Sequence, residues 1–176
     1  MSQNAGFLHD ASHVPITQLG LTTTDSQTLT ANNTTAHVPI FGITGTILVN
    51  SIYGVVTTTL GANNTAAYWR LNDQTNQSNI TVNTGTTLSG AVAGSTIIKK
   101  GLASAALTLL SASQEQVSEP TTLETLYFSP FVVQQLPTAA TNIEFTYTTT
   151  DTPTSGAITF YLGWVPLSVG ATVAAL

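Results

Sequence analysis

The sequence predicts an all-β protein: an antiparallel, jelly-roll-like β-sandwich of about eight strands with an extended N-terminal arm. Short runs of alternating apolar and polar residues are separated by turns rich in Gly, Pro and Asn, and no run has the spacing of a persuasive amphipathic helix. Threonine, which is β-branched and favours pleated surfaces, occupies 34 of the 176 positions. Many short strands separated by such turns are typical of a sandwich or a barrel.

Residues 1–36 are predicted to form the arm. Apolar residues are sparse there, so the segment buries too little apolar surface to offset the entropy lost on ordering. It is expected either to become ordered on another surface or to be a disordered tail, and its composition leaves both open. Residues 37–176 are expected to form a single β-sandwich domain, because the chain is long enough for one core and short for two.

The clearest pattern lies between Ala139 and Pro166. Two runs of apolar residues at every second position flank a turn at residues 151–156: Ile143, Phe145 and Tyr147 before it, and Ile158, Phe160, Leu162 and Trp164 after it. Side chains two residues apart share one face of a strand, so each run predicts a strand with one buried face. The Pro/Ser/Gly turn predicts that the two strands pair as an antiparallel hairpin.

A second hairpin is predicted from residues 44–60 and 66–71, with a bulge or bend at Gly54. Residues 37–41 predict a preceding strand, in which Pro39 indicates an edge or a strand start. Residues 72–78 are entirely polar and predict a loop. Further short strands are expected at 80–82, around Leu88, and at 96–98, 123–128 and 131–133, and the chain is expected to end in a tail of small residues. Residues 102–113 fit a helix or a strand, and we favour the strand.

Charged residues make up only 6% of the chain, against roughly a quarter in ordinary soluble domains. Hydroxyl and amide groups can enter an interface without the desolvation cost of a stripped charge, which favours permanent contact with other subunits. The chain also has almost no lysine to protect its sheet edges, so we expect neighbouring subunits or the arm to cover them. A secreted β-protein selected only for neutrality is the alternative.

The charge balance and the apolar runs bear on possible partners. With a net charge of -5 and only Arg70, Lys99 and Lys100 as cations, the chain has no basic stripe for phosphates, so nucleic acid is not an expected partner. No apolar run approaches the roughly 18 residues of a membrane helix, and residues 1–4 lack the features of an export signal. We therefore expect a soluble product made in the cytoplasm.

Few residues suggest chemistry, and we predict no catalytic, cofactor-binding or metal-binding site. The compact group of potential metal ligands lies in the arm without a rigid third ligand: His9, Asp10, Ser12 and His13. His37 is expected to be a strand-end histidine. The chain has no cysteine, no nucleophile elbow and no phosphate loop. No spacing forces two carboxylates together for glycoside hydrolysis, among Asp73, Glu115, Glu119, Glu124, Glu144 and Asp151. We expect that the protein is not an enzyme.

Aromatic residues leave open a sugar-stacking platform. The candidates are Tyr68, Trp69, Tyr127, Phe128, Tyr161 and Trp164. Aromatic side chains in strands more often belong to the core, so carbohydrate binding is the lesser hypothesis.

Two stretches resemble a group of small tailed-bacteriophage proteins. Residues 45–60, GTILVNSIYGVVTTTL, match a G-x-(I/V)-x-(I/V)…G-x-V-T-T run, and residues 158–167, ITFYLGWVPL, resemble a closing strand with an aromatic-x-Pro-Leu exit. The resemblance spans most of residues 39–170, departs from the pattern over 74–118, and carries over no catalytic residue.

This resemblance implies a virion structural protein. The expected role is a capsid decoration or cement protein on the outer surface of the phage head, forming a homotrimer and bound to the major capsid protein. A tail- or fibre-associated module that binds a receptor or a carbohydrate is the alternative.

Overall fold

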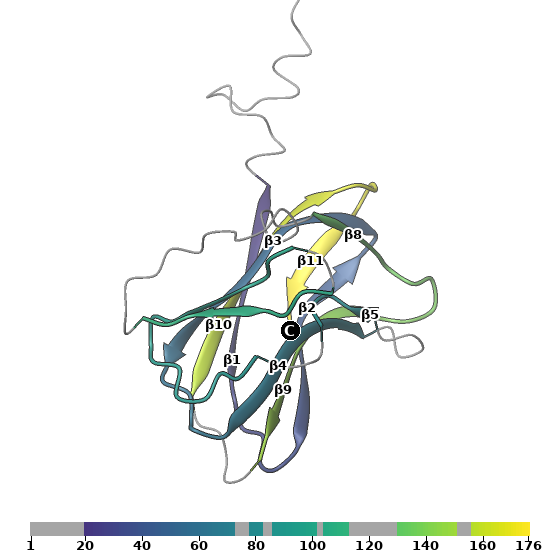
Figure 1. The fold of residues 1–176 in the computed structure, drawn as a ribbon. Helices are drawn as coiled ribbons and strands as arrows, with labels where there is room; N and C mark the ends of the chain where they lie inside the picture. The colour runs from purple at the N-terminus through teal and green to yellow at the C-terminus, as the bar shows by residue number, and fades with distance from the viewer. Residues whose placement is uncertain (1–19, 73–77, 83–85, 102–103, 113–129, 151–155) are drawn as a thin grey trace, which may run out of the picture.

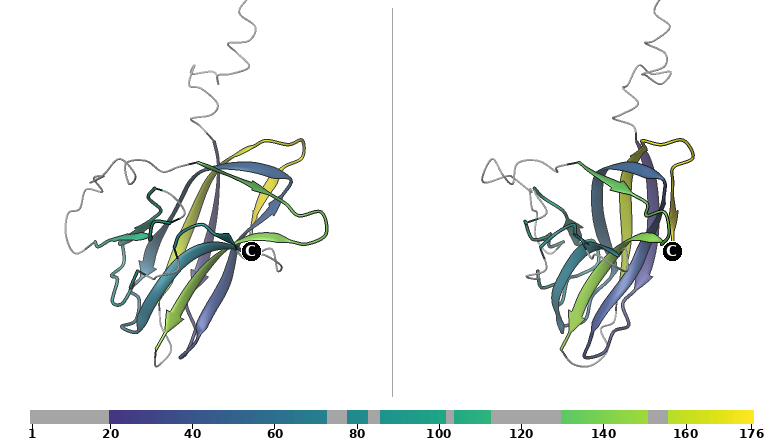
Figure 2. Two further views of the ribbon diagram at one scale, coloured as in Figure 1. Left: turned by 45° about the vertical axis from the view of Figure 1, so that its right-hand side comes forward. Right: turned by 90° about the vertical axis from the view of Figure 1, so that its right-hand side faces the viewer.

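The computed structural model describes residues 20–72, 78–82, 86–101, 104–112, 130–150 and 156–176. These residues form strands and no helix, and the strands lie in two antiparallel sheets packed face to face (Figures 1 and 2). The predicted all-β sandwich is therefore confirmed.

The first sheet, called sheet 1 below, has six strands. Their order is β1 (Leu21–Thr28), β10 (Ala157–Pro166), β3 (Thr46–Thr58), β6 (Thr96–Ile98) and β7 (Thr108–Leu110), with β8 (Phe131–Gln134) pairing with the other end of β3. The second sheet, sheet 2, has five strands. Their order is β11 (Thr172–Ala175), β2 (Thr35–Thr44), β9 (Thr141–Thr149), β4 (Asn64–Asn72) and β5 (Ser78–Asn79).

The chain changes sheets at each of its first three connections, between β5 and β6, and at each of its last three connections, from β8 to β11. Strand β2 pairs with β9 in sheet 2. The strands that follow these two, β3 and β10, pair with each other in sheet 1. The resulting orders, β1-β10-β3-β8 and β2-β9-β4-β5, are those of a jelly roll. The predicted resemblance to a jelly roll is thus borne out by the strand order.

Neither predicted hairpin forms. Strands β9 and β10 belong to different sheets, as do β3 and β4, so neither pair is joined by backbone hydrogen bonds. The predicted alternation itself was right, because both runs turn their apolar side chains toward the core. They meet there across the sandwich, where the ring centroids of Phe145 and Phe160 lie 4.9 Å apart.

Two glycines allow close approaches that this topology needs. Gly45, where the chain passes from β2 to β3, has φ +73°, and a Cβ there would lie 2.7 Å from Ser168 Oγ. Gly54 was expected to mark a bulge or a bend, yet the pairing of β3 with β10 and β6 is regular at this residue. A Cβ on Gly54 would lie 3.1 Å from Cδ1 of Phe160, so this glycine makes room for the buried ring.

The predicted arm boundary at residue 36 is wrong for the part that is described. Residues 21–28 form β1, the edge strand of sheet 1, which pairs with β10 along its whole length. Leu29 is 1% exposed and belongs to the core. The predicted arm therefore contributes a strand to its own domain from residue 21 onward, and residues 1–19 lie outside the described residues.

Several shorter elements also differ from the prediction. Residues 80–82 and Leu88 lie in loops and not in strands, but Ile80 and Leu88 are buried in the core. The amide of Ile80 donates to the carbonyl oxygen of Trp69, and the amide of Leu88 donates to that of Asn64. The expected C-terminal tail contains β11. Strands β6 and β8 agree with the sequence, whereas only residues 108–110 of the described part of segment 102–113 form a strand, β7. Pro39 lies on the part of β2 that β11 leaves uncovered. The strand expected at 123–128 lies outside the described residues.

Candidate functional site: the two outer faces of the sandwich

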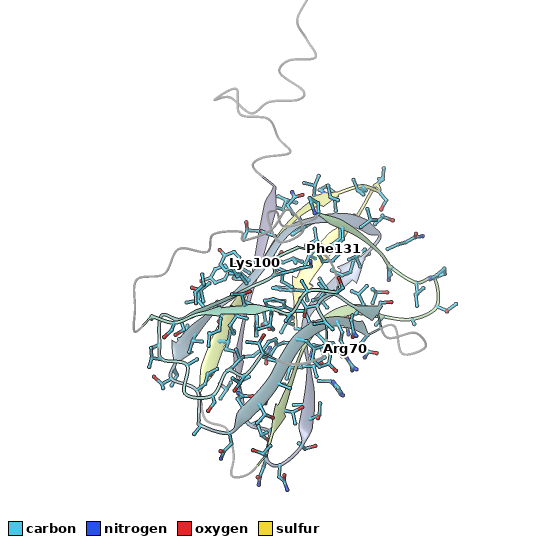
Figure 3. The ribbon with its side chains drawn as sticks, viewed as in Figure 1. Arg70, Lys100 and Phe131 are labelled. Atoms are coloured by element: carbon cyan, nitrogen blue, oxygen red, sulfur yellow. The ribbon has the colours of Figure 1, made fainter. Side chains whose placement is uncertain are left out.

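The outer face of sheet 2 carries a buried ion pair. Arg70 of β4 and Glu144 of β9 are direct cross-strand partners. Both Nε and Nη2 of Arg70 donate to Oε2 of Glu144, each at 2.7 Å, and the two side chains are 6% and 2% exposed. Figure 3 shows Arg70 on β4, away from Lys100 and Phe131. Burying two charged side chains this deeply costs desolvation free energy, and their mutual attraction offsets this cost only while they stay paired.

His37 of β2 lies beside this pair. Its Nδ1 atom is 3.0 Å from Oγ1 of Thr146, its cross-strand partner on β9. His37 is exposed, but partial loss of hydration lowers its pKa below the ordinary value, the positive charge of Arg70 lowers it further, and Glu144 opposes both. The imidazole is therefore held in its neutral form down to lower pH than a free histidine.

This cluster has a histidine beside a hydroxyl, yet it does not form a catalytic site. Thr146 is 0% exposed, so its hydroxyl group cannot meet a substrate. Glu144 is engaged with Arg70 and is not free to act as a base. Among the residues that the structure describes, no group of three His, Cys, Asp or Glu side chains could hold a metal ion. What the cluster can do is join β4, β9 and β2 on the outside of sheet 2.

The structure does not bring the sequence-based site candidates together. Trp69 and Trp164 are core residues, 0% and 5% exposed. Tyr68 and Tyr161 are half-buried, and their strands place them on the outer faces of opposite sheets. They cannot form one sugar-stacking platform. The remaining candidates lie outside the described residues: His9, Asp10, Ser12, His13, Asp73, Glu115, Glu119, Glu124, Tyr127, Phe128 and Asp151.

Lys99 is the second buried cation. It follows β6, is 6% exposed, and its Nζ donates a hydrogen bond to the carbonyl oxygen of Gly101. The same Nζ lies 6.0 Å from the centre of the Phe131 ring, within the range of a cation–π interaction. Burial lowers the pKa of the Lys99 ammonium group.

The outer face of sheet 1 carries an aromatic pair that sequence reasoning missed. Tyr53 of β3 and Tyr161 of β10 are cross-strand partners, and their rings stack at 4.7 Å with an interplanar angle of 7°. Because the buried residues of both strands occupy the alternate positions, the two tyrosines point away from the core. Period two in 158–164 placed Tyr161 outward, but Tyr53 was recognised only as a strand residue, because no local pattern identifies its partner on a strand about a hundred residues away.

Comparisons of the chain with protein-family models, with curated protein sequences and with solved structures find no match. The part of the chain that the structure describes also contains no helix able to span a lipid bilayer.

Proposed function

We propose that this chain is a structural protein of a virion, a decoration protein that binds the outer shell of a tailed-phage head. The proposal takes its class from the resemblance of residues 45–60 and 158–167 to phage virion proteins. The jelly-roll strand order supports it by analogy, since viral capsid domains share this architecture.

The observation that carries the proposal is the placement of charge. The described residues include five charged side chains, of which four are buried and the fifth, Lys100, is half-buried. The surface formed by these residues therefore has no fully exposed charged side chain, whereas ordinary soluble proteins rely on such side chains for solubility. A surface of hydroxyl groups and half-exposed apolar side chains suits a protein that works while packed against other subunits.

Linkage gives the mechanism of such a protein. A chain that binds the assembled lattice and not its separated subunits stabilises the lattice by mass action. The partners are then the major capsid protein and further copies of this chain, and the location is the outer surface of the head. No catalytic step is involved.

The test uses heads of the encoding phage assembled without this chain. We expect the purified full chain to sediment with these heads and not with unassembled major capsid protein, and to raise the temperature at which the heads open. Absence of the chain from native particles, together with no sedimentation with heads, would refute the proposal.

A carbohydrate-binding role in a tail or fibre is the second candidate, because lectins also use the jelly roll. With both tryptophans in the core, Tyr68 and Tyr161 are the described aromatic residues available from the sequence-based candidates. A glycan array separates the two roles. The second candidate requires binding that Tyr68→Ala or Tyr161→Ala abolishes.

A further inference from the structure

The outer face of sheet 1 is unusually apolar for the exterior of a sandwich. The tyrosine face, as we call it, is defined by eight outward-pointing apolar or aromatic residues: Leu48, Tyr53, Val55, Ile98, Leu110, Val132, Tyr161 and Val165. All except Val132 are half-buried, and Val132 is 57% exposed. Outward positions of a solvated sheet are normally polar, so this composition indicates a surface that is covered in the working protein.

The strand register arranges six of these residues in two rows across the sheet and places Val55 and Leu110 in a third row with Thr159 and Thr96. Val165, Leu48 and Val132 are successive partners on β10, β3 and β8. Tyr161, Tyr53 and Ile98 form the next apolar row, on β10, β3 and β6. The stacked tyrosine rings form the β10 and β3 part of this row, and aromatic side chains often contribute most of the binding energy of an interface. The partners Gly163 and Ser51 lie between these two rows, so the apolar side chains are grouped around small residues on one face of the sheet.

Hydroxyl groups border the patch on the side of β1. Thr22, Thr24 and Ser26 are exposed there, and Ser26 bonds Thr159 of β10 through their hydroxyl oxygens at 2.8 Å. No described carboxylate lies on this face: Asp25 points inward, where Gln27 donates to it, and Glu144 lies on the other sheet. After β6 come two cations, of which Lys99 is buried and Lys100 is half-buried.

We infer that the tyrosine face is the contact between two copies of this chain, packed sheet against sheet. The chain carries a net charge of -5, so two copies repel each other, and the repulsion is smallest when no carboxylates lie at the contact. Among the described residues, the tyrosine face carries no carboxylate, whereas the outer face of sheet 2 holds Glu144 beside Arg70 and His37. The tyrosine face of a second copy has the same apolar residues and the same bordering hydroxyl groups, so the two faces match in polarity.

Contact of a face with itself requires a twofold axis. The inferred assembly is therefore a dimer, in place of the homotrimer that the resemblance implies. Two sheets would pack about 10 Å apart, as the two sheets within one sandwich do. This inference goes beyond the proposed function and holds whether or not the chain binds a capsid.

Sedimentation velocity of the full chain tests the inference without any capsid. We expect the mass of two chains, falling to that of one chain on dilution. Val55→Glu puts a glutamate on each side of the contact, and we expect it to weaken dimerisation by more than about tenfold through repulsion and desolvation. Thr35→Glu adds the same charge at an exposed position on sheet 2 and should leave the dimer intact.

A second measurement keeps the test decisive if Val55→Glu fails to fold. The chain has no cysteine, so Val55→Cys and Thr35→Cys each introduce a single reactive thiol. Maleimide labelling of Val55→Cys should slow as the protein concentration rises, while labelling of Thr35→Cys should not. A monomer or trimer at all concentrations, equal weakening by both glutamates, or concentration-independent labelling of Val55→Cys would overturn the inference.

Discussion

Arg70 and Glu144 face each other directly across β4 and β9, and two nitrogen atoms of the guanidinium group share one carboxylate oxygen. Removing one partner from so buried a pair leaves an uncompensated charge in a site of low water content. We expect Glu144→Gln, which keeps the shape of the side chain, to lower the free energy of unfolding by about 3–5 kcal/mol. Urea denaturation followed by tryptophan fluorescence measures this change.

The matched control is the double variant Arg70→Met/Glu144→Leu, which removes both charges. Replacing a whole buried ion pair with apolar side chains is often neutral or stabilising, so this variant should unfold at the same urea concentration as the parent or a higher one. A loss of less than about 1 kcal/mol in the free energy of unfolding of Glu144→Gln is typical of an exposed ion pair. Such a result would contradict the burial of this pair.

The lowered pKa of His37 predicts a pH dependence of stability. Between the unfolded-state pKa and the lower folded-state pKa, the unfolded chain binds more protons at this residue than the folded chain does. Stability should therefore be complete above the unfolded value, near 6.5, and should fall as the pH drops from there toward the folded value. Thermal unfolding at a series of pH values between neutral and mildly acidic measures the slope.

His37→Gln is the comparison for this experiment, because glutamine can still bond Thr146 and does not titrate. We expect this variant to show a smaller loss of stability over the same pH range. An unchanged slope would assign the pH dependence to other groups, and a stability that rises on acidification would contradict the direction of the His37 shift.

For the two alternating runs, the sequence predicted which side of the strand is buried but not which strand lies beside it. In 143–147 and 158–164, period two placed Phe145 and Phe160 on core-facing sides, and both are 0% exposed. Alternation carries no information on pairing, and the short connection between the strands serves a hairpin or a change of sheet equally well. In the structure the two phenylalanines therefore meet face to face across the core instead of lying on neighbouring strands.

The ion pair escaped sequence reasoning for a similar reason. Arg70 and Glu144 are 74 residues apart, and only the register of β4 with β9 brings them together. A usable signal was present nonetheless. Both residues occupy outward positions of apolar strands in a chain with few charges, where an unpaired charge would be costly. The scarcity of charges could therefore have suggested that these two residues pair, although it could not have shown the register that joins them.

Gly54 should be sensitive to even one added carbon atom. An alanine Cβ would lie 3.0–3.2 Å from atoms of Ile158 and Phe160, which are themselves fully buried and cannot easily move. Overpacking of this kind typically costs about 1–3 kcal/mol, and we expect Gly54→Ala to lose that much of the free energy of unfolding. Chemical denaturation measures the loss.

A double-mutant cycle with Phe160→Leu identifies the cause of this loss. The smaller side chain removes the ring that the alanine would crowd, so Gly54→Ala should cost clearly less in the Phe160→Leu background. Additive effects of the two substitutions would show that the Phe160 ring is not the crowded neighbour and would assign the loss to Ile158, whose Cγ2 would lie 3.0 Å from the alanine Cβ.

Two N-terminal truncations separate the binding role of residues 1–19 from the structural role of residues 20–36. Removing residues 2–19 deletes none of the described contacts, so the unfolding temperature should stay unchanged. Removing residues 2–36 deletes β1 and buried Leu29, and frees the Tyr147 hydroxyl that accepts hydrogen bonds from the amides of Thr30 and Ala31, each at 3.1 Å. We expect that shorter chain to unfold far below the parent temperature or to fail to fold.

Leu29→Ala calibrates this comparison, because emptying one buried leucine site should cost about 2–5 kcal/mol without removing a strand. The sequence interpretation, in which residues 1–36 are an appendage, predicts instead that both truncated chains fold equally well. Capsid binding can therefore be assigned to the N-terminus only with the 2–19 deletion, since loss of binding after the 2–36 deletion would also follow from loss of the fold. If the 2–36 deletion left the unfolding temperature unchanged, β1 would not be an integral strand of sheet 1.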